Sequence, residues 1–148
     1  MSAALYNSDI LRLAASIPYA ERLADPDGSS EKRSPVCGSR VTVDVRLGPD
    51  GRVAALGLLV RACALGQASA SLLGVHALGR TPDELAKARD ALSEWLAGGG
   101  DAPDWPGLHV FEPARPHAAR HASVRLAFEA AAEAAAEAAA LAASRAPA

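Results

Sequence analysis

Hydrophobic and polar residues alternate with a period of two between residues 41 and 47, a pattern typical of a β-strand with one buried face. The sequence Gly-Pro-Asp-Gly at 48–51 supplies a turn, and residues 52–60 return rich in small and β-branched side chains. These features predict a β-hairpin. The polar run at 24–35 shows neither the strand period nor the helix period, and its Pro, Gly and Ser residues predict a loop. The apolar positions of the first strand are Val41, Val43, Val45 and Leu47.

A period of 3.6 residues recurs outside the hairpin and predicts amphipathic helices. Pro18 and Gly79 end the first two helices, and a capping box formed by Thr81 and Glu84 opens the third. Four prolines between residues 101 and 116 predict an extended connection. The predicted helices cover residues 8–17, 65–78, 81–96 and a stretch that begins near 118, and the residues expected to hold the connection down are Trp105, Leu108 and Phe111.

Beyond Phe128 the sequence becomes AAAEAAAEAAALAA. Alanine has the highest intrinsic helix propensity, so this segment is expected to be helical even without packing. We therefore expect a domain over residues 1–128 and an alanine-rich helical tail over 129–148. The tail lacks a broad stripe of large apolar residues, which favours a solvated extension that frays over the alternative of a helix that docks on a partner.

The charge and length of the chain narrow the class of protein. The 148 residues include 15 Lys and Arg against 17 Asp and Glu, a formal net charge of −2, so no strong attraction to nucleic acid or to anionic lipid is expected. The sequence has neither an apolar run long enough to cross a bilayer nor a secretory leader. We therefore expect one soluble, cytoplasmic α+β domain with no nucleic-acid or membrane partner.

Two cysteines, Cys37 and Cys63, are too few for a disulfide-stapled scaffold or for a zinc site made of four thiolates. If the four turn residues join the strands directly, Leu47 pairs with Arg52. The same register then places Cys37 opposite Ala62, one residue from Cys63. The hairpin arithmetic therefore predicts that the two thiols meet at the open end of the hairpin.

The surroundings of the two cysteines favour a reactive thiol site. Cys63 directly precedes a predicted helix, whose unpaired N–H groups favour an anion, and Gly38 allows the backbone beside Cys37 to approach other groups closely. Such a site suits a soft metal, an iron–sulfur cluster or transferred sulfur. The alternative is that both cysteines are inert core residues, because free cysteine is among the most buried residue types.

Several linked segments resemble the IscU/SufU/NifU-N family of iron–sulfur cluster assembly scaffolds. In chain order they are SPVCGSRVTVDV, RACALGQASASLLG, GRTPDELAKA and RHASVRLAF, preceded by YNSDI near the start of the chain. The likeness extends from about Tyr6 to Phe128. It implies a small antiparallel sheet, made of the hairpin with a third strand left open, covered by helices on one face. The 60 positions between Cys63 and Ser123, and the lack of an LPPVK segment, resemble the SufU branch more than the IscU branch.

The resemblance also implies a site of three cysteines and one aspartate that binds a nascent cluster or zinc. Cys37 and Cys63 match the first and second cysteines of the family. Ser39 stands where the family has aspartate, and Ser123 stands where it has the third cysteine. A serine hydroxyl is a poor ligand for zinc or iron, so the site would need other donors, and His121 is the best local substitute.

The family implies a function as well as a site. We expect a scaffold rather than an enzyme, which accepts sulfur or holds iron, an iron–sulfur cluster or zinc through Cys37 and Cys63 and works with a cysteine desulfurase. Three alternatives stay open: a protein-interaction module that has lost cluster chemistry, a thiol redox protein, and a zinc-binding protein. A homodimer could complete the ligand shell. No Walker A loop, dinucleotide fingerprint or recognisable pair of catalytic carboxylates occurs in the sequence.

Overall fold

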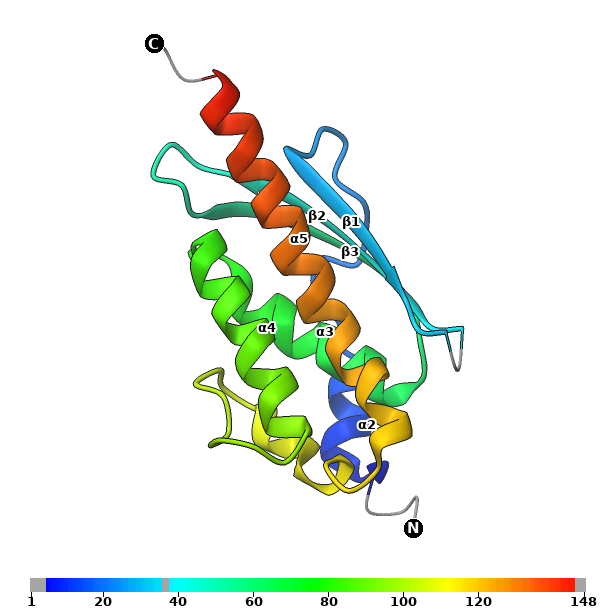
Figure 1. Ribbon diagram of the computed structural model, residues 1–148. Helices are drawn as coiled ribbons and strands as arrows, with labels where there is room; N and C mark the ends of the chain where they lie inside the picture. Colours follow the sequence, from blue (N-terminus) through cyan, green and yellow to red (C-terminus); the bar gives the residue numbers. More distant parts are fainter. Residues whose placement is uncertain (1–4, 36–37, 146–148) are drawn as a thin grey trace.

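The computed structural model describes residues 5–35 and 38–145, and it shows a three-stranded antiparallel sheet with helices packed on one face (Figure 1). The sheet has the order β1-β2-β3. This arrangement confirms the expected α+β fold class. In chain order the elements are α2 (Ser8–Ala14), β1 (Gly28–Arg33), β2 (Arg40–Leu47), β3 (Val53–Arg61), α3 (Ala64–Ala77), α4 (Pro82–Leu96), the 3-10 helices η1 (Leu108–Ala114) and η2 (Ala118–Arg120), and α5 (His121–Arg145).

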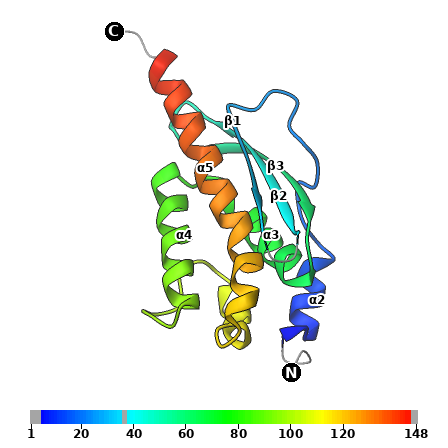
Figure 2. The ribbon, with the colours of Figure 1, turned by 45° about the vertical axis from the view of Figure 1, so that its right-hand side comes forward.

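The core lies between the inner face of the sheet and the helices. Alternate residues of β2 point inward, as the period of two predicts, and Val41, Val43 and Val45 are fully buried. Helix α5 lies across the inner face and contacts β1, β2, α3 and α4, so that it separates α4 from the sheet (Figures 1 and 2). The long C-terminal helix is therefore the central packing element of the described chain.

The predicted hairpin forms, but its register differs from the arithmetic. Val45 pairs with Leu56 and Arg40 pairs with Arg61, while an irregularity between Arg46 and Leu47 makes Val53, not Arg52, the partner of Leu47. The turn is one residue longer than predicted because the N–H of Gly48 donates to the carbonyl oxygen of Arg52 at 2.8 Å. Continuing this register past the strands would set position 63 opposite position 38, rather than position 62 opposite position 37.

The loop predicted over residues 24–35 is wrong in its second half, where β1 pairs with residues 40–45 of β2. This strand escapes the hydrophobic pattern because its inward side chains bond to polar groups of α5. Ser30 Oγ donates to Glu133 Oε1 at 2.6 Å, and Lys32 Nζ lies 2.8 Å from Glu133 Oε2. Polar pairing between an edge strand and a helix thus replaces the apolar contacts that a period of two would reveal.

Gly28 shows how closely β1 approaches α5. A Cβ atom at Gly28 would lie 2.7 Å from the backbone nitrogen of Ala138 and would overlap the carbonyl oxygen of Ala134. Only a residue without a side chain permits this backbone contact. Gly28 on β1 and the alanines of α5 that face it therefore form one closely packed interface.

The alanine-rich segment packs into the core, so the expectation of a solvated, fraying extension is wrong for its first half. Helix α5 continues past Phe128 without a break. Large residues are absent there because the helix axis lies too close to the sheet to leave room for them. The buried alanines beyond Phe128 are Ala130, Ala131, Ala132, Ala134, Ala135 and Ala138.

The proline-rich connection is only partly extended, because η1 occupies seven of its residues. Trp105, Leu108 and Phe111 are buried as predicted. The indole N–H of Trp105 donates to the carbonyl oxygen of Leu72 at 3.0 Å, which fixes the connection against α3. No helix in the described part of the chain is long and apolar enough to span a bilayer.

Candidate functional site

The start of α3 positions the Cys63 thiol at one end of the sheet. Cys63 is the N-cap residue, with an extended backbone at φ −68° and ψ 173°, and its side chain makes no capping hydrogen bond. Its carbonyl oxygen accepts a hydrogen bond from the N–H of Gln67 at 2.9 Å, the first bond of the helix. The side chain is half-buried. The thiol therefore stands where the unpaired N–H groups of a helix end favour an anion.

Strand β1 ends and strand β2 begins at the same end of the sheet (Figure 1). Arg40, the first residue of β2, pairs with Arg61, two residues before Cys63. Ser39 is buried, and its carbonyl oxygen accepts a hydrogen bond from the N–H of Ser34 at 2.8 Å. The sheet register thus brings Ser39 and Cys63 to neighbouring strand ends. Cys37 lies outside the described residues, so the meeting of the two thiols stays a prediction.

The first turn of α5 packs against the first turn of α3. A Cβ atom at Gly66 would lie 3.3 Å from the carbonyl oxygen of Ser123 and 2.7 Å from the Cβ of Ala62. One turn further along, Ser69 Oγ donates to the carbonyl oxygen of Val124 at 2.5 Å. The absence of a side chain at Gly66 therefore allows the helix that carries Ser123 to lie against the helix that begins beside Cys63. Ser123 itself is buried, with 4% of its surface exposed.

His121 is buried at the start of α5 but directs one ring nitrogen to the backbone. Its Nε2 lies 3.1 Å from the carbonyl oxygen of Ala114 and 2.9 Å from that of Arg115. Because a carbonyl oxygen can only accept, Nε2 must carry the proton in these bonds. A protonated nitrogen is not a metal ligand, so any ligation by His121 in this arrangement falls to Nδ1.

The donor set at this end of the sheet is poor in metal ligands. Within residues 5–35 and 38–145, no three His, Cys, Asp or Glu side chains are grouped to hold a metal ion. The described donors are one thiol, two serine hydroxyls and His121. Such a set suits one thiolate bond and leaves most of a tetrahedral shell to groups from elsewhere.

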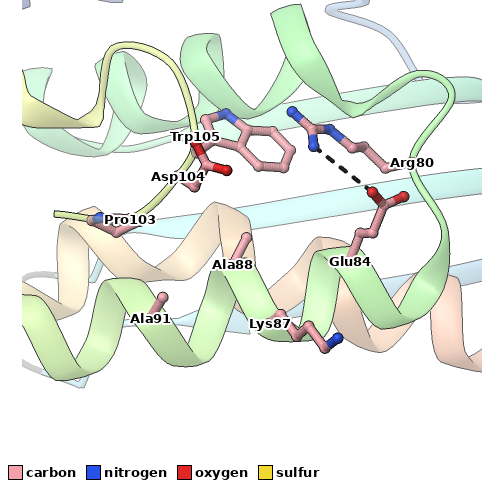
Figure 3. Close-up of a pocket in the computed structure, with 8 residues that line it drawn as sticks. All are labelled: Arg80, Glu84, Lys87, Ala88, Ala91, Pro103, Asp104 and Trp105. Atoms are coloured by element: carbon pink, nitrogen blue, oxygen red, sulfur yellow. Dashed lines mark ion pairs between the residues drawn. The ribbon is translucent and has the colours of Figure 1, made fainter. Parts of the chain in front are cut away.

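A hollow of about 240 Å³ lies between α4 and residues 103–105, away from the predicted site residues that the structure describes (Figure 3). The guanidinium of Arg80 lies 4.6 Å from the centre of the Trp105 ring and 4.0 Å from the Glu84 carboxylate. Among the described residues, no Cys, Ser or Thr lines the hollow, and none of the predicted site residues lines it. The sequence pattern pointed to Trp105 as an anchor but gave no signal of this hollow.

Comparisons with solved structures place the fold in a known class. The N-terminal part of a nitrogen-fixing NifU-like protein from Brucella abortus superimposes with a TM-score of 0.86 and 40% sequence identity, over 91% of this chain and 94% of that chain. A protein named as an iron–sulfur cluster assembly scaffold of the SUF system, from Fervidobacterium islandicum AW-1, superimposes with a TM-score of 0.83 over 91% of this chain and 99% of that chain. The second protein is only 16% identical and therefore shows the shared fold alone.

The chain belongs to the IscU/SufU/NifU-N family, because its identity to the NifU-like protein extends over nearly the whole length of both chains. No sequence-family model matches the chain, and no curated protein matches it either. The resemblance noted from the cysteine-bearing segments is thereby confirmed at the level of family and fold.

Proposed function

We propose that this protein is a scaffold for iron–sulfur cluster assembly that accepts sulfur and holds iron or a labile cluster through Cys37 and Cys63. Membership in the IscU/SufU/NifU-N family is the observation that carries the proposal. The position of Cys63 supports it, because a half-buried thiol at a helix start suits a thiolate that must reach both solvent and a ligand.

The two thiolates would bind iron as soft donors and fill half of a tetrahedral shell. Iron and sulfide are the cargo of the scaffold, so the remaining bonds can come from sulfide, from water or from a second copy of the chain. Ser39 and Ser123 stand beside the thiol end but are weak ligands near neutral pH. We therefore expect a cluster that is held less firmly than one with four protein ligands, as suits cargo that must leave.

Sulfur would arrive from a cysteine desulfurase as a persulfide. The Cys63 thiolate attacks the outer sulfur of the desulfurase persulfide, a new S–S bond forms on Cys63, and the desulfurase cysteine leaves as a thiolate. Each transfer adds one sulfur atom to the chain and consumes no further oxidant. Cys37 is the second thiol of the chain and would accept a sulfur atom from the desulfurase persulfide by the same reaction.

Intact-chain mass spectrometry after incubation with a cysteine desulfurase and free cysteine tests the sulfur step. We expect the wild-type protein to gain at least one sulfur atom, which a reductant removes, and Cys63→Ser to lose most of that gain. Ser69→Ala, which changes a buried hydroxyl near α5 and no thiol, is the control for general damage to the fold. An equal sulfur gain in the wild type and in Cys63→Ser would contradict a role of Cys63 in sulfur acceptance.

A second candidate function is a protein-interaction module without cluster chemistry. It is favoured by the two serines at family ligand positions and by the backbone bonds that occupy His121 Nε2. Such a module would bind the desulfurase but gain no sulfur and no iron. Binding measured in parallel with the sulfur gain therefore separates the two candidates.

A further inference from the structure

The outer face of the sheet carries three arginines in one row beside the thiol end. Arg33 pairs with Arg40 and Arg40 pairs with Arg61, so the three residues lie side by side across β1, β2 and β3. Their neighbours Val41 and Val60 point into the core, which directs the arginines outward. This arginine row directly follows Ser39 and ends two residues before Cys63.

Two of the three arginines form no ion pair with a carboxylate in the described part of the chain. The third, Arg33, forms an ion pair with Glu31, with its Nε 2.8 Å from Oε2. Arg40 and Arg61 form no ion pair there, although they face each other across neighbouring strands. Like charges in directly opposed positions destabilise a sheet. The opposed pair therefore does not stabilise the sheet, and although Arg40 attracts the nearby Glu31 carboxylate, neither guanidinium is held in an ion pair there, so both can bind a ligand.

The available guanidiniums border a hollow of about 170 Å³ that holds mainly polar groups. Arg22 also lies at the edge of the hollow, but its guanidinium forms an ion pair with Asp44, with Nε 2.7 Å from Oδ2. Glu31, the hollow's carboxylate, is paired with Arg33 and also lies in the field of Arg40, and both guanidiniums lower the Glu31 pKa and offset its negative charge. The lining residues are Arg22, Glu31, Arg40, Thr42, Leu59 and Arg61.

We infer that this hollow is a binding site for a compact dianion that carries carboxylate or phosphate oxygens. A guanidinium presents a planar fork of N–H donors that matches two oxygens of such a group. Two opposed forks suit a ligand with two negative charges. The volume of the hollow is below the range of drug-sized pockets, which limits the ligand to a small molecule or group. Cys63 does not line this hollow, and oxyanion binding there does not depend on thiol chemistry.

Titration followed by amide chemical shifts in NMR tests the inference on the full chain. The probes are inorganic phosphate, malonate and citrate, with sodium chloride at matched ionic strength to remove general screening. We expect saturable shifts at residues of the outer face with at least one of the oxyanions and none with chloride. Tighter binding of phosphate or of the carboxylates tells which group the site prefers.

Paired variants locate the binding. Arg40→Gln with Arg61→Gln should weaken the preferred oxyanion at least about tenfold, because two charge-assisted contacts are lost. Arg12→Gln with Arg145→Gln removes the same charge from exposed positions elsewhere and should bind as the wild type does. If the first pair fails to fold, Arg40→Lys with Arg61→Lys keeps the charge but removes the planar forks, and weaker binding is again expected.

Two results would overturn the inference. One is the absence of saturable shifts for all three oxyanions in the wild-type protein. The other is binding by the Arg40 and Arg61 variants that equals that of the wild type.

Discussion

Asp44 is a charged residue on the outer face of the sheet whose side chain is completely buried. Burial raises its pKa, but hydrogen bonds from the Arg22 guanidinium, Ser29 Oγ and the N–H of Leu23 outweigh burial and lower the pKa below its ordinary value. The strand pattern placed Asp44 on the exposed side and gave no sign of this burial. The cause is the segment before β1, which lies so close to the sheet that a Cβ at Gly57 would be 2.5 Å from the carbonyl oxygen of Glu21.

Replacement of Asp44 by Asn should lower the free energy of unfolding by about 1–3 kcal/mol at neutral pH, because the amide keeps the size but loses charge-assisted bonds. The folded-state pKa of Asp44 is lowered, so its contribution is present above the unfolded pKa of about 3.9 and is lost as the pH falls toward the folded value. Urea unfolding from pH 7 down to pH 3 measures this difference.

Asp9→Asn changes an exposed carboxylate paired with exposed Arg12 and serves as the control, with little expected change. A constant difference between Asp44→Asn and the wild type across this pH range would show that Asp44 does not stabilise the fold through its charge.

The residues of the candidate site were partly predictable. Family spacing singles out Cys63, Ser39 and Ser123 as candidates, and the register brings Ser39 and Cys63 to neighbouring strand ends. The backbone bonds of His121 Nε2 could not be predicted, since they depend on how η1 ends beside α5. The arginine row could have been found from the sequence only with the correct pairing of all three strands.

At the scale of elements, the pattern of large apolar residues predicted the hairpin and the helices but not β1 or the buried half of α5. Both failures have one cause, because β1 and α5 meet through small and polar side chains. Ser29 donates its N–H to Glu137 at 3.3 Å, while Gly28 and Ala134 touch through the backbone. Hydrophobicity scales give little weight to such contacts.

The interface between β1 and α5 predicts that two similar substitutions differ in their effect on stability. Ala134→Leu should lower the free energy of unfolding by about 1–3 kcal/mol, because Ala134 is fully buried against β1 and extra volume has no space. Ala136→Leu changes an exposed position of the same helix, so it should stay within about 0.5 kcal/mol of the wild type. Chemical unfolding measures both values.

Leucine and alanine both favour a helix, so propensity does not separate these variants. Equal stability of Ala134→Leu and Ala136→Leu would mean that the alanine-rich segment is not packed on the sheet in solution.

At the scale of the whole molecule, the end of β1 and the starts of α3 and α5 lie at the same end of the sheet (Figure 2). Different residues therefore pack the core and form the candidate site. Small residues such as Gly66 hold the two helix starts together, and the thiol and serines stand beside them. The packing of the helix starts therefore does not depend on which side chains stand at positions 39 and 123.

The most direct test of the proposed scaffold is the iron and acid-labile sulfide bound after anaerobic reconstitution, measured with an absorption spectrum. We predict that the wild-type protein retains both after gel filtration, that Cys37→Ser and Cys63→Ser each lose them, and that Ser39→Asp with Ser123→Cys retains more than the wild type. Iron and sulfide contents that are the same in the wild type and in both cysteine variants would contradict the proposal.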